Sequence, residues 1–127
     1  MTKYLNCLIT HGDMAKSMKL VVEKLVGQES NLYCFSNQTS GFEEIEAKIS
    51  ELAAEQYPTK IIIFVDLMGG SCWVASNRLK HKFSNLTIAA GVNIPMLVSY
   101  FINIERLEWP ELMEKISADA KKGVVVR

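Results

Sequence analysis

The amino-acid sequence predicts a single α/β domain built on a parallel four-stranded sheet of order 2-1-3-4, with helices on both faces. Three observations lead to this fold class. Short apolar runs typical of strands alternate with segments of helical periodicity, a pattern that favours a parallel sheet with right-handed crossovers. Residues 61–65 (IIIFV) are apolar without alternation, as a strand covered on both faces requires. Polar, glycine-containing turns follow the first and third runs.

Each element follows from a local pattern. Strands are expected where short apolar runs occur, over residues 4–10, 31–35, 61–65 and 86–90. Helices are expected where apolar residues recur every three or four positions, over residues 14–26, from 42 to before Pro58, over 71–81 and 96–102, and over 109–122. Val124, Val125 and Val126 then form a short β-prone tail.

Several residues define the helix boundaries. Gly27 is placed to end the first helix, and Pro95 suits the first turn of the fourth. The segment Ser40-Gly41-Phe42-Glu43 has the spacing of a capping box. The first helix is expected to bury a stripe formed by Met14, Met18, Val21, Val22 and Leu25. Residues 96–102 are almost wholly apolar, which suggests a helix covered by something beyond its own domain.

Composition limits the class of protein. The 127 residues, 49% of them hydrophobic, suit one domain spanning residues 1–127. Fourteen basic residues balance fourteen acidic ones, which argues against nucleic acid or an anionic membrane as a partner. Cys7, Cys34 and Cys72 are widely spaced and are interpreted as thiols rather than as a disulfide or zinc framework. With no signal peptide or membrane span evident, we expect a cytoplasmic protein.

The predicted strand order brings two polar residues together. In an open parallel sheet, ligands bind beyond the carboxyl ends of the strands, where the strand order reverses. Strands one and three are neighbours in the order 2-1-3-4, and they end at His11 and Asp66. A carboxylate that accepts the Nδ1 proton of His11 would fix the tautomer and leave the Nε2 lone pair facing outward. His11 is therefore a candidate nucleophile, oriented by Asp66.

A glycine pair beside Asp66 predicts an anion site. Gly69 and Gly70 allow a tight turn into the helix that starts at Ser71, so that backbone amides point at a negatively charged group. Together with His11 and Asp66, this turn describes a site for a phosphohistidine. No metal ion or organic cofactor is expected.

Three motifs carry a resemblance to a known family. They are Thr10-His11-Gly12, then DLMGGS at residues 66–71, then AGVNIPML at residues 90–97. In order and spacing they resemble the enzyme IIA component of the mannose-type bacterial sugar phosphotransferase system. Two departures are visible. Cys72-Trp73 stands where Pro-Phe often follows in that family, and the sequence ends without a IIB domain, so a separate protein is expected to be the acceptor.

The resemblance implies a function and partners. His11 would accept a phosphoryl group from the carrier protein HPr and pass it to a separate IIB component, which serves a IIC/IID membrane permease. Asp66 would orient His11, and Gly69, Gly70 and Ser71 would hold the phosphoryl group. The protein would act in the cytoplasm, in association with the permease complex. The family also implies a homodimer that exchanges a terminal strand, for which residues 124–126 are available.

Three other functions stay open at this point. The phosphotransfer subunit that serves dihydroxyacetone kinase is a close relative in fold and chemistry. A hydrolase would use Ser71 as nucleophile, His11 as base and Asp66 as orienting group, although no Gly-x-Ser-x-Gly elbow is present and Ser71 is better explained as a helix cap. A non-catalytic regulator would bind an anion reversibly in the same crevice.

Overall fold

The computed structural model describes residues 3–38 and 41–127. It contains strands β1 (Tyr4–Thr10), β2 (Leu32–Ser36), β3 (Lys60–Val65) and β4 (Leu86–Ala90). The helices are α1 (Met14–Val26), α2 (Phe42–Gln56), α3 (Ser71–Lys80), α4 (Ile94–Asn103) and α5 (Trp109–Lys122). The predicted bounds of β1, β4, α1 and α5 agree with these, and the predicted bounds of the other elements agree to within one or two residues.

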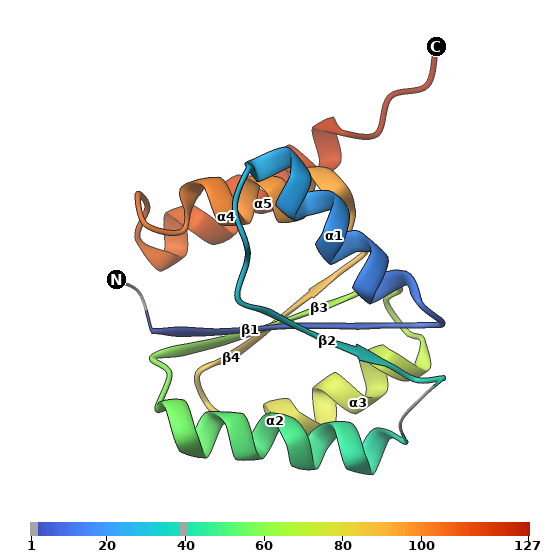
Figure 1. Cartoon of the computed structure of the whole chain (residues 1–127), viewed down its shortest axis with the longest axis vertical. Coiled ribbons are helices and arrows are strands. Elements are labelled where there is room, and N and C mark those ends of the chain that lie inside the picture. The colour runs from blue at the N-terminus through green and yellow to red at the C-terminus, as the bar shows by residue number, and fades with distance from the viewer. Residues whose placement is uncertain (1–2, 39–40) are drawn as a thin grey trace.

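All four strands are parallel and lie in the order β2-β1-β3-β4, so the predicted fold class and strand order are confirmed. Helices α1, α4 and α5 cover one face of the sheet, and α2 and α3 cover the other (Figure 1). The two central strands supply both cores by alternation: Leu8, Ile62 and Phe64 face the first group of helices, whereas Cys7 and Ile63 face the second.

The buried stripe of α1 differs from the prediction. Ala15 and Val22 are buried, whereas Val21 and Leu25 are exposed. The sequence carries two overlapping apolar stripes that are offset by one residue, or about 100° around the helix. Packing against β2 and α4 buries the stripe that contains Val22, so the prediction was right for Val22 and wrong for Val21 and Leu25.

The expectation that α4 is covered from outside the domain is wrong. Met96, Leu97, Tyr100 and Phe101 are buried within the chain, because α4 packs between α1 and α5. Tyr100 also donates a hydrogen bond to Asn6 of β1, so this apolar helix carries a polar link into the sheet.

The predicted capping box of α2 is not confirmed. Ser40 of the predicted capping box lies outside the described residues, and the N-cap of α2 is Gly41, which makes no side-chain cap bond.

Residues 124–127 adopt no regular secondary structure in the single chain, and Val124 and Val126 are exposed. In Figure 1 this tail leaves the end of α5 and points away from the molecule. Strand exchange therefore stays a prediction.

Candidate functional site

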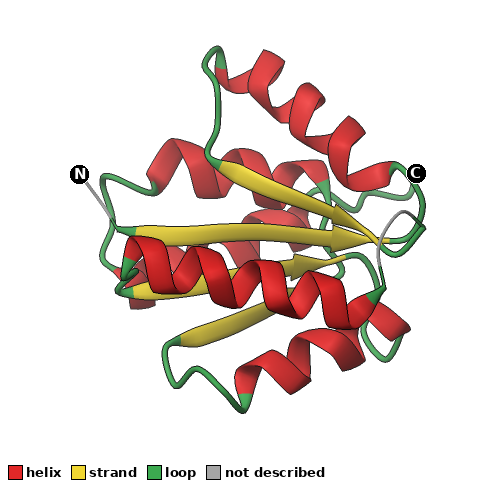
Figure 2. Ribbon diagram, turned by 60° about the horizontal axis from the view of Figure 1, so that its bottom comes forward, coloured by secondary structure: helices red, strands yellow, loops and turns green. Residues whose placement is uncertain are grey.

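The site lies at the carboxyl edge of the sheet. All four strands point toward this edge (Figure 2). The register pairs Ile9 with Val65, so β1 and β3 end side by side. His11 follows β1 and Asp66 follows β3, and the fold thereby joins two residues that are 55 positions apart. This juxtaposition is the one that the predicted strand order implied.

Asp66 holds His11 at two points. Its Oδ2 atom lies 2.8 Å from His11 Nδ1 and accepts a second hydrogen bond, 3.0 Å long, from the backbone N–H of His11. Burial alone would raise the pKa of Asp66, but these hydrogen bonds and the nearby imidazole hold it below its ordinary value. Asp66 is therefore ionised at neutral pH, and its Oδ2 is an acceptor that stabilises the Nδ1–H tautomer.

The other ring nitrogen faces Ser71. The Ser71 Oγ atom lies 3.2 Å from His11 Nε2. Helix α3 begins at Ser71 with Gly70 as its N-cap, and no side-chain cap bond is present. The expectation that Ser71 acts as a helix cap is therefore wrong, because its hydroxyl contacts the histidine instead. His11 is 43% exposed, and thus its Nε2 edge is open to a partner.

The glycine pair builds the turn between Asp66 and α3. Gly69 has φ 83°, a left-handed conformation that side-chain-bearing residues rarely adopt. A methyl group at Gly70 would lie 3.5 Å from His11 Cε1, so the glycine lets the backbone run close beside the imidazole. The N–H of Gly70 donates to Leu67 O at 3.4 Å. The first turn of α3 lacks a side-chain cap and is directed at the same place as His11 Nε2.

Three polar residues, to none of which the sequence analysis assigned a role, fix the loop that carries His11. Thr10 Oγ1 accepts the N–H of Ala15 at 2.8 Å, and Ser36 Oγ donates to Gly12 O at 2.6 Å. Asn37 Oδ1 accepts the N–H of Gly12 at 3.2 Å. Ser36 ends β2 and Asn37 follows it, so their placement depends on the pairing of β2 with β1 and is not visible in the local sequence.

The third motif supports the site from behind. The N–H of Val92 donates to Val65 O at 3.0 Å, which ties this loop to the end of β3 next to Asp66. Asn93 caps α4, since its Oδ1 accepts the N–H of Met96 at 2.9 Å and its Nδ2 donates to Ala120 O at 3.0 Å. The motif thus connects the end of β3 with α4 and α5. Among the described residues, no hydrogen bond joins it to His11, so its role is to support the site.

Cys72 is a further neighbour of the histidine. Its side chain is fully buried, and its Sγ lies 3.9 Å from His11 Nδ1. Burial, and then the negative charge of Asp66, raise the pKa of this thiol to about 11. The ligand atoms of His11, Asp66 and Cys72 all lie within 4.8 Å of one another. The sequence offered one signal, because residue 72 occupies the first turn of α3 directly after Ser71.

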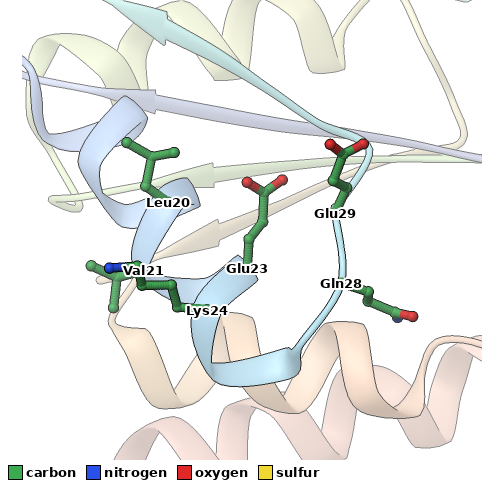
Figure 3. Close-up of a pocket in the computed structure, with 6 residues that line it drawn as sticks. All are labelled: Leu20, Val21, Glu23, Lys24, Gln28 and Glu29. Carbon is green, nitrogen blue, oxygen red and sulfur yellow. The ribbon is translucent and has the colours of Figure 1, made fainter.

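Two hollows of the surface lie outside the cluster of His11, Asp66 and Cys72. One of about 470 Å³ lies on the outer side of α1, where side chains from α1 and the following loop line it (Figure 3). Its lining comprises Leu20, Val21, Glu23, Lys24, Gln28 and Glu29. A smaller groove, lined by Phe42, Val74 and Arg78, opens beside Ser71. His11, Asp66, Ser71 and Cys72 thus lie together at the carboxyl edge of the sheet and not in the cavity beside α1.

Comparison with known proteins decides the family. The family model described as "PTS system fructose IIA component" matches residues 7–117, a range that contains all three motifs. The chain belongs to this family of phosphotransferase-system IIA components. The resemblance carried by the motifs is therefore confirmed.

Individual relatives agree with this assignment. The mannose-specific EIIAB component of Escherichia coli K12 is 33% identical over 95 residues, which are 70% of this chain but only 28% of that protein. The sorbose-specific EIIA component of Lacticaseibacillus casei is 24% identical over 110 residues, covering 86% of this chain and 80% of the relative. A crystal structure of an EIIA component from Streptococcus agalactiae superposes with a TM-score of 0.85 at 16% identity, covering 97% of this chain and 96% of the other.

Among the described residues, no helix combines the length and the apolar character that a membrane crossing requires.

Proposed function

We propose that this IIA protein is a phosphocarrier that accepts a phosphoryl group on His11 Nε2 from phospho-HPr and passes it to a separate IIB component. The observation that carries the proposal is the contact of Asp66 Oδ2 with His11 Nδ1 at 2.8 Å. It assigns the ring proton to Nδ1 and leaves a lone pair on Nε2. Asp66 is a positioning residue in this scheme, because it acts through the histidine.

The transfer step needs only groups that are already present. The Nε2 lone pair attacks phosphorus, the phosphorus–nitrogen bond of the donor breaks, and its electron pair returns to the donor imidazole. Asp66 stabilises the positive charge that develops on the His11 ring. The reverse sequence delivers the group to IIB. Positioning and electrostatics by these residues supply the catalysis.

The phosphoryl oxygens require hydrogen-bond donors. Gly69, Gly70 and Ser71 form the turn that faces Nε2, and the start of α3 adds the positive end of its helix dipole. Ser71 Oγ, at 3.2 Å from Nε2, is placed to donate first to the imidazole and then to a phosphoryl oxygen. We propose this turn as the phosphoryl-binding site.

The test is intact-protein mass spectrometry after incubation with phosphoenolpyruvate, enzyme I and HPr. The wild-type protein should gain one acid-labile phosphoryl group, and His11→Ala should gain none. His81→Ala is the matched control, because His81 is the other histidine of the chain and lies exposed at the end of α3. Phosphorylation of His11→Ala, or its loss in His81→Ala, would contradict the proposal.

The sugar and the acceptor are further parts of the proposal. Relatives are named for mannose, sorbose and fructose, and the site contains no group that distinguishes these sugars. We propose that the IIB partner and the IIC/IID permease select the sugar, while this chain acts at the cytoplasmic side. If the protein passed its phosphoryl group to the components of a dihydroxyacetone kinase system supplied in place of IIB, it would instead be the phosphotransfer subunit of that system. Reversible binding of an anion, without formation of covalent phosphohistidine, would support the non-catalytic regulator.

One observation favours a second activity. Ser71 Oγ, the His11 ring and Asp66 form a hydrogen-bonded series with the connectivity of a serine-hydrolase triad. Incubation with a fluorophosphonate probe decides between the two chemistries, with Ser71→Ala as control. A hydrolase should be labelled at Ser71, whereas the phosphocarrier should stay unlabelled.

The proposed homodimer concerns the C-terminal tail. Val124, Val125 and Val126 are exposed in the single chain, and β2 and β4 each offer a sheet edge to a fifth strand. Sedimentation of the full chain and of a variant lacking residues 124–127 tests the exchange. The full chain should sediment as a dimer and the truncated chain as a monomer. Equal behaviour of the two would contradict a role of the tail.

A further inference from the structure

The three side chains around the histidine come from different parts of the chain. His11 follows β1, Asp66 follows β3, and Cys72 lies in the first turn of α3. A nitrogen, an oxygen and a sulfur atom thus meet within 4.8 Å. The phosphocarrier scheme uses the first two residues and has no role for the thiol.

The set of atoms matches the preferences of one metal. Zn²⁺ binds imidazole nitrogen, carboxylate oxygen and thiolate sulfur in a tetrahedron, with bonds of about 2.0–2.3 Å that place the ligand atoms roughly 3.3–3.6 Å apart. Here Nδ1 lies 2.8 Å from Asp66 Oδ2 and 3.9 Å from Cys72 Sγ. The first distance is too short for the tetrahedron and the second too long, and all three ligand atoms lie within 4.8 Å, so side-chain shifts of about 0.5 to 1.2 Å would admit the ion. Mg²⁺ and Ca²⁺ prefer oxygen ligands and do not suit a thiolate.

A second observation points to a cation. Asp66 Oδ1 is buried and accepts no hydrogen bond from the described residues. A buried carboxylate oxygen without a partner is unusual, because its desolvation is uncompensated. A metal ion held by the Asp66 carboxylate would compensate for this missing partner, while the backbone N–H of His11 lies within hydrogen-bond distance of Oδ2 at 3.0 Å.

We propose that His11, Asp66 and Cys72 form a Zn²⁺ site, and that the bound ion prevents phosphoryl transfer to His11. The ion binds Nδ1, a carboxylate oxygen of Asp66 and the Cys72 sulfur, and water completes the tetrahedron. The S–H bond of Cys72 breaks and its proton leaves to solvent. The Nδ1 proton moves through solvent to Nε2, so one proton is released in total.

The two states of the site exclude each other because they need opposite tautomers. Phosphoryl transfer needs the proton on Nδ1 and a lone pair on Nε2, whereas zinc coordination uses the Nδ1 lone pair and leaves a proton on Nε2. Ser71 Oγ, at 3.2 Å, accepts a hydrogen bond from that proton. The inhibition rests on the proposed phosphocarrier function, but zinc binding itself does not.

Direct binding is measured first. Metal-free protein is titrated with Zn²⁺ by calorimetry, and Co²⁺ is added to a second sample to detect a sulfur-to-cobalt charge-transfer band. The wild type should bind one ion and show the band. Cys72→Ser should bind about 100-fold more weakly or worse and lack the band, since even the loss of a residue that supports a ligand costs 10–100-fold in affinity. Cys34→Ser, which changes a thiol outside the cluster, should behave as the wild type.

Two further variants keep the test decisive. Cys72→Ala replaces the thiol without burying a hydroxyl, and Asp66→Asn removes the carboxylate; both should lose the one-to-one binding. Circular dichroism identifies any variant that does not fold, and the folded variants carry the conclusion. Absence of zinc binding by the wild type, or tight binding that survives in Cys72→Ala, would overturn the site.

Inhibition is measured with phospho-HPr, with and without Zn²⁺. Wild-type phosphorylation should fall when the ion is added and return on chelation. The rate of Cys72→Ala, whatever its value, should not respond to the ion, which also excludes an effect on enzyme I or HPr. A wild type that binds zinc yet is never phosphorylated would refute the phosphocarrier and leave the site intact. A wild type that is phosphorylated equally with bound zinc would refute the inhibition.

Discussion

Asp66 Oδ2 contacts both the Nδ1 atom and the backbone N–H of His11, at 2.8 and 3.0 Å. The first contact sets the tautomer of the ring, and the second fixes the backbone from which the ring projects. Two hydrogen bonds to one oxygen thus restrain the orientation of the imidazole relative to the α3 turn. The predictions below separate this restraint from the other features of the site.

Asp66→Asn should slow phosphorylation of His11 by about 100-fold or more, because an amide no longer enforces the Nδ1–H tautomer. The rate is measured by rapid quench with phospho-HPr in excess. Asp13→Asn is the control, since Asp13 is an exposed neighbour whose side chain makes no cap bond. Equal slowing in both variants would mean that local charge matters and the hydrogen bonds do not.

Ser71→Ala should slow transfer by about tenfold, because it removes one donor and leaves the backbone amides in place. Ser71→Thr keeps a hydroxyl and should recover most of the rate. The same quench experiment measures both variants. A rate for Ser71→Ala equal to that of the wild type would show that the hydroxyl at 3.2 Å has no part in transfer.

Gly69→Ala should destabilise the protein by roughly 1–2 kcal/mol, since a side chain at φ 83° is strained. It should also lower the phosphorylation rate through distortion of the turn. Gly41→Ala is the control, because Gly41 has φ −70° and nothing within 4 Å of an added methyl group. Urea denaturation gives the stabilities. A stable and fully active Gly69→Ala would show that the turn tolerates change.

Tyr100→Phe should cost about 1–3 kcal/mol of stability, because it leaves Asn6 Oδ1 buried without its donor. Phosphorylation of His11 should be unaffected, since this link lies in the core between α4 and β1. Tyr57→Phe should change neither property, because Tyr57 is 80% exposed. A neutral Tyr100→Phe in the urea experiment would mean that water or a rearrangement satisfies Asn6.

Acid should reveal the stabilising contribution of Asp66. Its pKa is lower in the folded protein than in the unfolded chain, so the ionised carboxylate stabilises the fold above the ordinary carboxyl pKa of about 4. That contribution should decline as the pH falls through the lowered folded pKa. The stability difference between wild type and Asp66→Asn, measured in urea from neutral to acid pH, should therefore be constant near neutrality and shrink in acid. A difference that grows on acidification would contradict the sign.

Much of the fold was accessible from the sequence because local patterns define it. The apolar run at residues 61–65 identified a doubly covered strand, and Gly27 ends α1 in a left-handed conformation as predicted. The pairing of His11 with Asp66 followed from strand order alone. Ser36 and Asn37 were missed, because their hydrogen bonds to Gly12 depend on β2 lying beside β1.

The sequence by itself determined where strands and helices occur, that the sheet is parallel, and that a histidine and an aspartate end neighbouring strands. Tertiary structure alone decided which of two overlapping stripes of α1 is buried, that α4 is covered by α1 and α5, and that Cys72 lies 3.9 Å from His11 Nδ1. The physical reason is the range of the forces involved. The periodicity of apolar residues shows which side chains along a few turns of one element avoid water. The choice between two similar apolar faces, and the contacts of one thiol, depend instead on packing among elements far apart in the chain.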